Sequence, residues 1–438
     1  MSVSIEQPRF SCALGAQQSV VAIRRGAPIT HAGPGCSYKI HGFLGQGEGY
    51  AGGSTIPCTN FSETEVVYGG EDRLRTVIEG ALKVIDADLY VVLTGCTSDI
   101  VGDDVGMVVS DFAQRGVPIV YAETGGFKSN NYASHETVVN AIIDQYSDRY
   151  APGREKDPGL VNVFASVPYQ DPHWEGNLEE IKRVLEGIGL RVNILFGQHS
   201  EGVAEWQRIP QAALNIVANA WVGTGIAAHL EEKYGTPYIH FPYLPIGGVE
   251  TSRFLRRVVE KLPLDPGRAD AFIGREEARF YAHLERTADF LLEFRYGLPR
   301  RFHTLLDAGY TVGLAKFLVN ELGILPGQLF ITDGTPEARQ EAVREQLRHV
   351  SDRRSAEVAF SADGGWIQEQ IRSGGNKHRA LILGTGWERD LAAELKADLL
   401  ILGVPVTYRL ILNRGYTGYN GGLRLIEDIY DHALNTYR

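Results

Sequence analysis

The sequence predicts an α/β protein made of three units, each with a parallel sheet covered by helices. Short apolar runs bounded by Gly and Pro alternate with longer segments of helical period along the whole chain of 438 residues. The 50 glycines suit the many tight turns that connect strands to helices in such a fold. A chain of this length is expected to hold two or three domains at roughly 100–200 residues each.

The first unit, residues 1–155, is expected to contain a βαβ arrangement. A helix is predicted from about Glu71, because apolar residues recur there at helical spacing: Leu74, Val77, Ile78, Ala81, Leu82 and Ile85. The continuous apolar run 88–94 predicts a buried parallel strand, followed by a helix over 105–115 and a strand over 117–122. Residues 42–53 are rich in glycine and have no period, which predicts a loop.

The second unit, residues 156–295, and the third, residues 296–438, show the same alternation. A polar Pro- and Gly-rich segment, 151–159, is the predicted boundary between the first two units. Strands are predicted at 160–164, 191–196, 213–217, 238–241, 329–332, 380–383 and 399–402. Helices are predicted at 178–188, 226–234, 311–322 and 336–347, with a helix-rich stretch over 250–292.

Composition excludes several classes of protein. The net charge of −11 argues against a nucleic-acid surface. No apolar run approaches the roughly 18–20 residues of a membrane span, and no signal peptide is expected at the N-terminus. The four cysteines fall within the first 96 residues and do not resemble a secreted disulfide framework, so we expect a reducing, cytoplasmic location.

Three cysteines are the candidate ligands of a metal site. Cys36, Cys58 and Cys96 each lie in a loop or at the end of an apolar run, with Gly or Pro beside them. Thiolates are preferred ligands of zinc and of iron–sulfur clusters, and an ordinary cluster takes about four of them. Three thiolates are an incomplete set, so the missing ligands are expected from a partner chain. The small apolar neighbours of Cys12 favour a buried core thiol that binds no metal, and a place near the candidate site is the alternative.

Polar residues near these cysteines have simpler explanations. Asp99, Asp103 and Asp104 are expected to cap a helix that begins near Asp103 and points its positive end at Cys96. Residues 124–131 form a second Gly-rich loop after a strand, without the Gly-Lys-Ser/Thr ending of a Walker A loop. Ser129 or Asn130 could supply an oxygen ligand there, although a turn role is favoured.

The chain resembles the component 1 subunits of nitrogenase and nitrogenase-like reductases, and among them the β (K-type) subunits. The resemblance rests on three segments in order, 31–36, 58–70 and 96–104, which look like the three P-cluster cysteine motifs of that family. Two further segments, 245–254 and 414–422, look like a second-domain segment of K-type chains and a C-terminal Gly-rich turn. The resemblance implies three Rossmann-like domains and an α2β2 heterotetramer with a homologous D-type (α) subunit.

The resemblance also implies a cofactor and a role. In the family, three cysteines from each of two subunits hold an [8Fe-7S] P-cluster, which corresponds here to Cys36, Cys58 and Cys96. The chain would relay electrons from an ATP-dependent [4Fe-4S] iron protein to the active-site cofactor of its partner. There is no cysteine after Cys96, which departs from the D-type pattern. The chain lacks the long N-terminal extension of molybdenum-nitrogenase β subunits, so the resemblance favours a shorter relative, such as a methylthio-alkane reductase, over classical molybdenum nitrogenase.

Several alternatives remain open within this resemblance. They are a vanadium or iron-only nitrogenase β subunit, a cofactor-assembly scaffold of the E/N type, and a tetrapyrrole reductase subunit with a [4Fe-4S] cluster. A zinc-stabilised binding protein is a fourth alternative, disfavoured because no Cys-x2-Cys pair is present.

Overall fold

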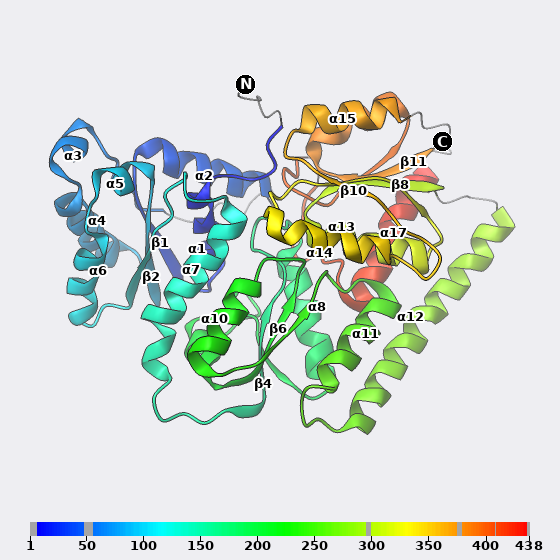
Figure 1. Cartoon of the computed structure of the whole chain (residues 1–438), viewed down its shortest axis with the longest axis horizontal. Coiled ribbons are helices and arrows are strands. Elements are labelled where there is room, and N and C mark those ends of the chain that lie inside the picture. The colour runs from blue at the N-terminus through cyan, green and yellow to red at the C-terminus, as the bar shows by residue number, and fades with distance from the viewer. Residues whose placement is uncertain (1–6, 48–55, 295–298, 375–378, 408, 436–438) are drawn as a thin grey trace.

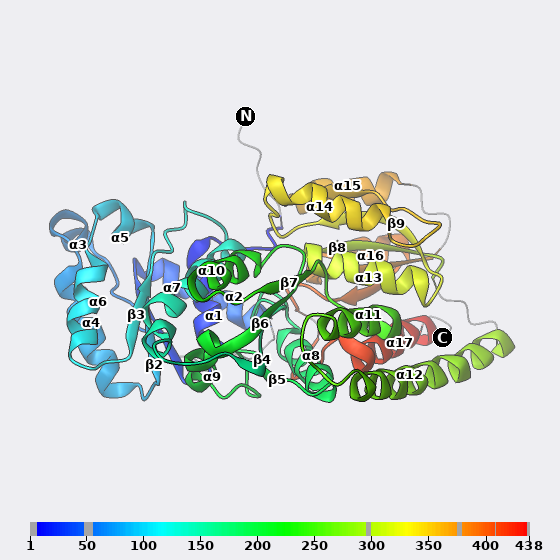
Figure 2. The same ribbon diagram turned by 60° about the horizontal axis from the view of Figure 1, so that its bottom comes forward.

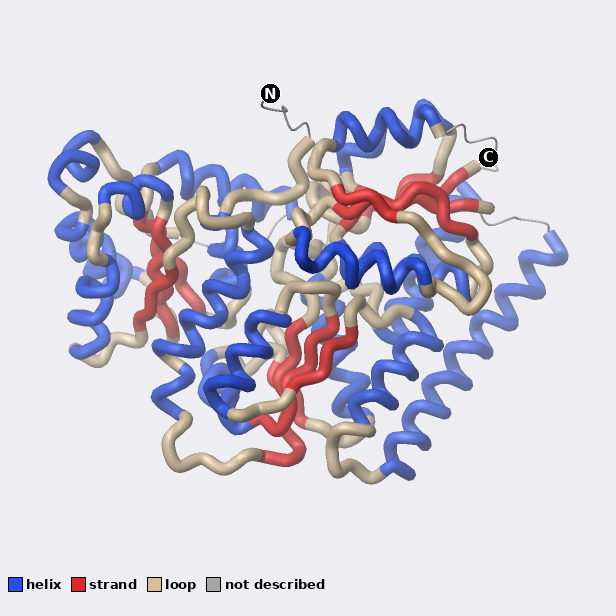
Figure 3. Tube along the Cα trace, viewed as in Figure 1, coloured by secondary structure: helices blue, strands red, loops and turns tan. Residues whose placement is uncertain are grey.

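Three parallel sheets organise the part of the chain that the computed structural model describes, residues 7–47, 56–294, 299–374, 379–407 and 409–435 (Figure 1, Figure 3). Every pairing between neighbouring strands in these sheets is parallel. The first sheet lies at one end of the molecule, and the second and third sheets lie beyond it, in separate layers (Figure 2). The predicted α/β class with parallel sheets is confirmed.

The first sheet has the strand order β1-β2-β3, with β1 at Gly26–His31, β2 at Leu89–Thr94 and β3 at Ile119–Ala122. Its register pairs His31 with Thr94 and Leu93 with Ala122, so the carboxyl ends of the three strands lie at one edge. The helices of this unit are α1 (Gln17–Val21), α2 (Pro34–Gly47), α3 (Glu63–Tyr68), α4 (Glu71–Val84), α5 (Cys96–Val101), α6 (Val105–Gln114) and α7 (Asn131–Gln145), with 3₁₀ turns η1 (Ala13–Ala16) and η2 (Ser147–Tyr150).

The hydrophobic pattern explains how this unit folds. Strand β2 is buried at all its positions, as its continuous apolar run predicts. Helix α4 begins at Glu71 as predicted and buries Leu74, Ile78 and Ala81, which lie on one face at helical spacing. These side chains join one apolar cluster with residues of β1, β2 and α6, which fixes the helices against the sheet.

The predicted loop over 42–53 is wrong in its first half. Helix α2 continues through Gly42 to Gly47, although each helical glycine costs about 1 kcal/mol relative to alanine. Pro34 stands at the first helical position, where its fixed φ favours helix initiation. The rest of the predicted loop, 48–55, lies outside the described residues.

The second sheet has the order β5-β4-β6-β7. Its strands are β4 (Asp157–Phe164), β5 (Arg191–Asn193), β6 (Ala212–Ala218) and β7 (Tyr238–Phe241). Its helices are α8 (Trp174–Gly187), α9 (Val203–Arg208), α10 (Thr224–Tyr234), α11 (Gly247–Val259) and α12 (Pro266–Phe294), with the turn η3 (Ile209–Gln211). The predicted strand and helix positions of this unit are confirmed within a few residues.

The third sheet has the order β10-β9-β8-β11-β12. Its strands are β8 (Arg301–Leu306), β9 (Leu325–Ile331), β10 (Val358–Phe360), β11 (Ala380–Gly384) and β12 (Asp398–Ile401). Its helices are α13 (Ala308–Asn320), α14 (Glu337–Arg348), α15 (Gly364–Ser373) and α16 (Arg389–Leu395), with the turn η4 (Gly386–Glu388). The central strand β8, the edge strand β10 and the helices α15 and α16 have no counterpart in the sequence-based prediction.

The C-terminal helix α17 (Gly418–Asn435) ties the last part of the chain to the middle unit. It packs against α11 and α8, and the Asn177 Oδ1 accepts hydrogen bonds from the amides of Tyr416 at 2.7 Å and Thr417 at 3.1 Å. The domain limits 1–155, 156–295 and 296–438 therefore stay predictions.

Within the described ranges, no helix is both long enough and apolar enough to cross a membrane.

Candidate metal centre

The carboxyl edge of the first sheet brings Cys36, Cys58 and Cys96 into one region. Cys36 lies in the first turn of α2, which follows β1, and Cys96 is the first residue of α5, which follows β2. Cys58 forms an isolated parallel bridge with Thr30 of β1. Ligands of parallel sheets bind at this edge, so the three side chains lie where the sequence places its candidate site.

The loop residues Ala32 and Gly33 form the hub of this arrangement. The Cys58 thiol faces the carbonyl oxygens of Ala32 at 3.4 Å and Gly33 at 3.8 Å, and the Cys36 amide donates to the same Gly33 carbonyl at 3.1 Å. Gly95, just before Cys96, approaches so closely that an added Cβ would overlap the Ala32 side chain. The backbone around Ala32 therefore positions the segments that carry all three cysteines.

Cys96 and the loop after β3 are joined through Gly126. The Gly126 amide donates a hydrogen bond to the Cys96 Sγ at 3.1 Å. The prediction that a helix beginning near Asp103 points its positive end at Cys96 is wrong. A separate helix, α5, begins at Cys96 itself. Only the following helix α6 is capped as predicted, by the Asp104 Oδ1, which accepts from the Met107 amide at 2.8 Å.

The prediction that Cys12 is buried is wrong. Its side chain is exposed, whereas the other three cysteines are half-buried, and all four thiols are free. A Cβ added to Gly126 would lie 3.0 Å from the Cys96 Sγ and 3.3 Å from the Cys12 Sγ. Cys12 therefore stands beside the candidate ligands. Its apolar neighbours Ala13, Leu14 and Ala16 are the buried residues of this segment.

Burial and mutual repulsion disfavour the charged forms of the thiols when no metal is present. Burial raises the pKa of Cys36, and the charges of Cys12, Cys96 and Cys58 raise it further. Burial also raises the pKa of Cys58, although the hydrogen bond that the Asn60 amide donates to its sulfur opposes this effect. A bound cation reverses such repulsion and releases the protons. Binding of a cation by these thiols would therefore be coupled to their deprotonation.

A buried His31–Asp103 pair supports the end of β1. The His31 Nε2 lies 2.9 Å from the Asp103 Oδ2, and the Asp103 Oδ1 accepts from the Gly70 amide at 2.9 Å. Burial is the dominant effect and lowers the pKa of His31. Asp103 thus ties the start of α4 to β1 rather than capping a helix. Asp99 is likewise no cap; it pairs with the Lys128 Nζ at 2.8 Å.

The two candidate oxygen ligands have local partners. The Asn130 Oδ1 accepts from the Ala133 amide at 3.0 Å and caps α7. The Ser129 hydroxyl lies 2.6 Å from that of Ser134. These contacts agree with the favoured turn role for both residues.

The spacing of the thiols decides which kind of metal group they could hold. Among the described residues, no three His, Cys, Asp or Glu side chains are placed to hold one metal ion. A cluster of several irons and sulfides is wider than one ion, so its thiolates stand further apart. The free thiols of Cys36, Cys58 and Cys96 around the Ala32–Gly33 hub could hold such a wider group. The sequence pattern did not favour a place for Cys12 beside these thiols, and it did not indicate the role of Gly126.

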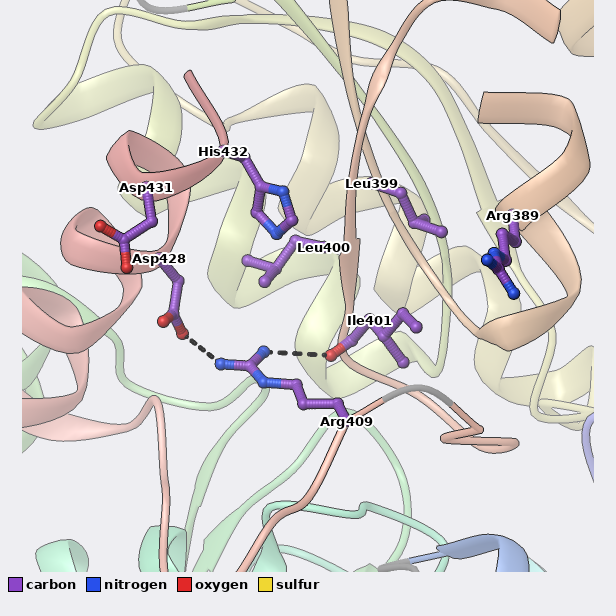
Figure 4. A pocket seen from close by; sticks show the side chains of 8 residues that line it. All are labelled: Arg389, Leu399, Leu400, Ile401, Arg409, Asp428, Asp431 and His432. Atoms are coloured by element: carbon purple, nitrogen blue, oxygen red, sulfur yellow. Dashed lines mark hydrogen bonds and ion pairs between the residues drawn. The ribbon is translucent and has the colours of Figure 1, made fainter. Parts of the chain in front are cut away.

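A separate cavity of about 390 Å³ lies in the C-terminal part of the chain (Figure 4). The Arg409 side chain lies in this cavity. Its guanidinium forms an ion pair with Asp428 of α17 at 2.6 Å and donates to the Ile401 carbonyl at 3.5 Å. Its lining comes from Arg389 and from segments around β12 and α17. Because the four cysteines belong to the first unit, this cavity is not part of the thiol site.

Three parallel sheets, with free thiols gathered at the carboxyl edge of the first, define this chain as a thiol-bearing α/β protein. It belongs to the family of nitrogenase component 1 type oxidoreductases, whose description matches residues 11–434. The predicted membership of this family is confirmed, and with it the class of oxidoreductase. Members of the family generally bind iron–sulfur clusters.

Two of the similar proteins are subunits designated beta or B. It is 24% identical over 476 residues to the nitrogenase molybdenum-iron protein beta chain of Methanococcus maripaludis, covering 99% of this chain and 95% of the relative. It is 25% identical over 383 residues to a subunit of the light-independent protochlorophyllide reductase of Chlorobium phaeobacteroides, covering 82% of this chain and 66% of the relative. A solved structure described as nitrogenase Cp1 at pH 6.5 superposes with a TM-score of 0.80 at 20% identity, covering 100% of this chain and 95% of that one.

Proposed function

We propose that this chain is the β-type subunit of a nitrogenase-like reductase and holds an iron–sulfur cluster through Cys36, Cys58 and Cys96. The observation that carries the proposal is the convergence of three free thiols on the Ala32–Gly33 hub at one sheet edge. When bound, the cluster accepts and donates single electrons. The protein's part is to orient the thiols, to donate the Gly126 amide hydrogen bond to sulfur, and to limit contact with water.

A partner subunit is proposed to complete the site. Apolar side chains on the elements that carry or follow the cysteines, and beside Gly126, are between 62% and 85% exposed: Tyr38 on α2, Val67 and Tyr68 on α3, Ile100 on α5 and Phe127. Such a group of exposed apolar residues marks a protein–protein interface. We propose that a homologous D-type (α) subunit covers it in an α2β2 heterotetramer and contributes further ligands to a shared [8Fe-7S] cluster.

The proposed role is electron relay. An ATP-dependent [4Fe-4S] iron protein would bind transiently and reduce the cluster, which passes electrons to the active-site cofactor of the D-type partner. The free state of all four cysteines supports a reducing, cytoplasmic location. Small organic sulfur compounds such as methylthio-alkanes are the substrates that we propose within the resemblance to nitrogenase-like reductases.

A second candidate is a tetrapyrrole reductase subunit with a [4Fe-4S] cluster. It is supported by the similarity to the light-independent protochlorophyllide reductase subunit, at 25% identity and coverage of 82% of this chain. The two candidates differ in the size of the cluster. The number of irons per pair of subunits therefore discriminates them.

The experiment compares the variants Cys36→Ala, Cys58→Ala and Cys96→Ala in the complex purified without oxygen. Each should lose cluster iron and acid-labile sulfide, because each removes one thiolate ligand. Thr97→Ala is the matched control, since it changes the residue next to Cys96 without removing sulfur. If all three cysteine variants kept the iron and sulfide of the wild type, the proposed function would be refuted.

A further inference from the structure

A cavity of about 700 Å³ lies between α11, α13 and the loop that follows α14. Val249 and Arg253 of α11 line one side of it, and Lys316 and Asn320 of α13 line another. Residues 349–353, which follow the end of α14, form the third side. Helix α13 contacts both α11 and α14 and lies between them (Figure 2). Small-molecule sites usually occupy roughly 300–1,000 Å³, so the cavity has the size of a binding site.

The lining of this cavity is positively charged, although the chain as a whole is negative. It includes three cationic side chains, Arg253, Lys316 and Arg353, and one carboxylate, Asp352. Three positive charges and one negative charge give the lining a net charge of +2 with His349 neutral, whereas the whole chain carries −11. A concave surface with an excess of one charge attracts ligands of the opposite charge. The cavity therefore favours an anion.

Lys316 is the most buried of these charged residues. It is only 5% exposed. Its ammonium donates to the His349 carbonyl at 3.0 Å and lies 5.0 Å from the centre of the Tyr243 ring. An ammonium has three N–H donors, and among the described residues no Asp or Glu side chain forms an ion pair with this one. A buried charge without a counter-ion is costly, so an anion bound in the cavity would compensate it.

The buried carboxylate of Glu250 lies close to Lys316 but is bound by other groups. Glu250 accepts from the Tyr243 hydroxyl at 2.6 Å and from the Arg253 Nη1 at 2.8 Å and 3.0 Å. Burial lowers the pKa of Lys316, and the charge of Glu250 opposes this effect. Both contacts with Arg253 use a single nitrogen of its guanidinium, which carries five N–H groups. Glu250 thus holds Arg253 at the cavity and leaves other donors to bind a ligand.

Arg353 completes the cationic group from the exposed side of the cavity. Its side chain is exposed, and its amide donates to the Ser351 hydroxyl at 3.4 Å, in a turn closed by the bridge between Ser351 and Arg354. Within the described ranges, no carboxylate forms an ion pair with the Arg353 guanidinium. This guanidinium is therefore available to an anion that also contacts Lys316.

We propose that this cavity binds a small organic molecule that carries a phosphate monoester. Such a phosphate has a charge of about −1.5 to −2 at neutral pH, which matches the charge of the lining. Lys316 would act on it as a point charge, and the guanidinium groups of Arg253 and Arg353 would donate paired N–H bonds to its oxygens. The proposal does not depend on the cysteine site, so its failure would leave the proposed function untouched.

Isothermal titration calorimetry of the complex, purified without oxygen in a phosphate-free buffer, tests this proposal. The probe is glycerol 3-phosphate, and succinate and glycerol are compared with it at equal ionic strength. The probe should bind with a dissociation constant of about 1 mM or tighter. Succinate should bind at least about threefold more weakly, because its two charges are on separate groups, and glycerol should not bind. Absence of probe binding would overturn the proposal, and so would equal affinity for succinate, which would show attraction to charge alone.

Three variants locate the binding. Lys316→Met removes the buried charge and keeps an unbranched side chain, so it should weaken probe binding by at least about tenfold. Arg353→Ala changes an exposed loop residue, which does not endanger folding, and should weaken binding by about threefold or more. Lys233→Met is the matched control, since it removes a lysine charge from α10, where Lys233 pairs with Asp144 at 3.1 Å, and it should leave the affinity unchanged.

The outcomes decide the location of the site. Wild-type affinity in both Lys316→Met and Arg353→Ala would overturn the proposal. An equal loss of affinity in all three variants would show an effect of net charge alone and would also overturn it. Circular dichroism confirms the fold of each variant, and Arg353→Ala decides alone if Lys316→Met does not fold.

Discussion

Replacement of Gly95 by alanine should disturb the cysteine hub directly. An alanine Cβ at this position would stand well under 3.0 Å from the Ala32 Cβ. Gly95 has φ −105° and ψ −179°, a conformation that alanine adopts without strain, so the effect is purely steric. Overpacking of this kind costs typically about 1–3 kcal/mol. Because the Ala32 carbonyl faces Cys58 and the next residue after Gly95 is Cys96, the displacement should also lower cluster occupancy.

The assay pairs urea unfolding with iron analysis, and Gly80→Ala is the matched control. Gly80 lies inside α4 with nothing within 4 Å of its missing Cβ. Alanine there should stabilise the protein by about 0.5–1 kcal/mol and leave the iron content unchanged. If Gly95→Ala matched the wild type in both stability and iron, the close approach at Ala32 would not be what positions the cysteines.

Two further predictions concern acid stability and assembly. Burial lowers the pKa of His135 to about 3 from an ordinary value near 6.5. Between these values the unfolded chain binds a proton that the folded chain excludes, so stability falls as pH falls. His135→Gln should reduce the slope of unfolding free energy against pH by up to about 1.4 kcal/mol per pH unit. Urea unfolding between pH 6.5 and 4 measures this slope. An unchanged slope would contradict a buried neutral His135. Tyr68→Glu should weaken association with the partner by at least about tenfold in sedimentation experiments. Val84→Glu is the control, since Val84 is similarly exposed at the far end of α4, and it should leave association unchanged. Equal effects of the two variants would exclude the α3 surface as the interface.

The strands and the cysteine edge could be predicted because their signals are local. The apolar run of β2 is buried throughout, and Cys96 follows it directly at the carboxyl end. Strand β8 escaped prediction because Arg301, His303 and Thr304 interrupt its apolar residues, yet His303 and Thr304 are buried. Burial of polar side chains at the centre of a sheet depends on the surrounding fold, which a single-sequence pattern does not contain.

The predictions for Cys12 and for the start of the 42–53 segment were wrong for a related reason. Small apolar neighbours indicate that the segment around Cys12 is buried, but they do not tell which residue of a tight turn faces outward. In the structure the turn η1 buries Ala13, Leu14 and Ala16 and leaves Cys12 outside. Similarly, the glycines of α2 lower helix propensity, yet the segment is helical to Gly47, because tertiary context can override propensity.

The most direct test of the central claim is an anomalous difference map at the iron absorption edge, from crystals of the complex grown without oxygen. The account predicts iron within bonding distance of the sulfur atoms of Cys36, Cys58 and Cys96, at the carboxyl edge of β1 and β2. A map with iron elsewhere in the complex and none at this edge would contradict it.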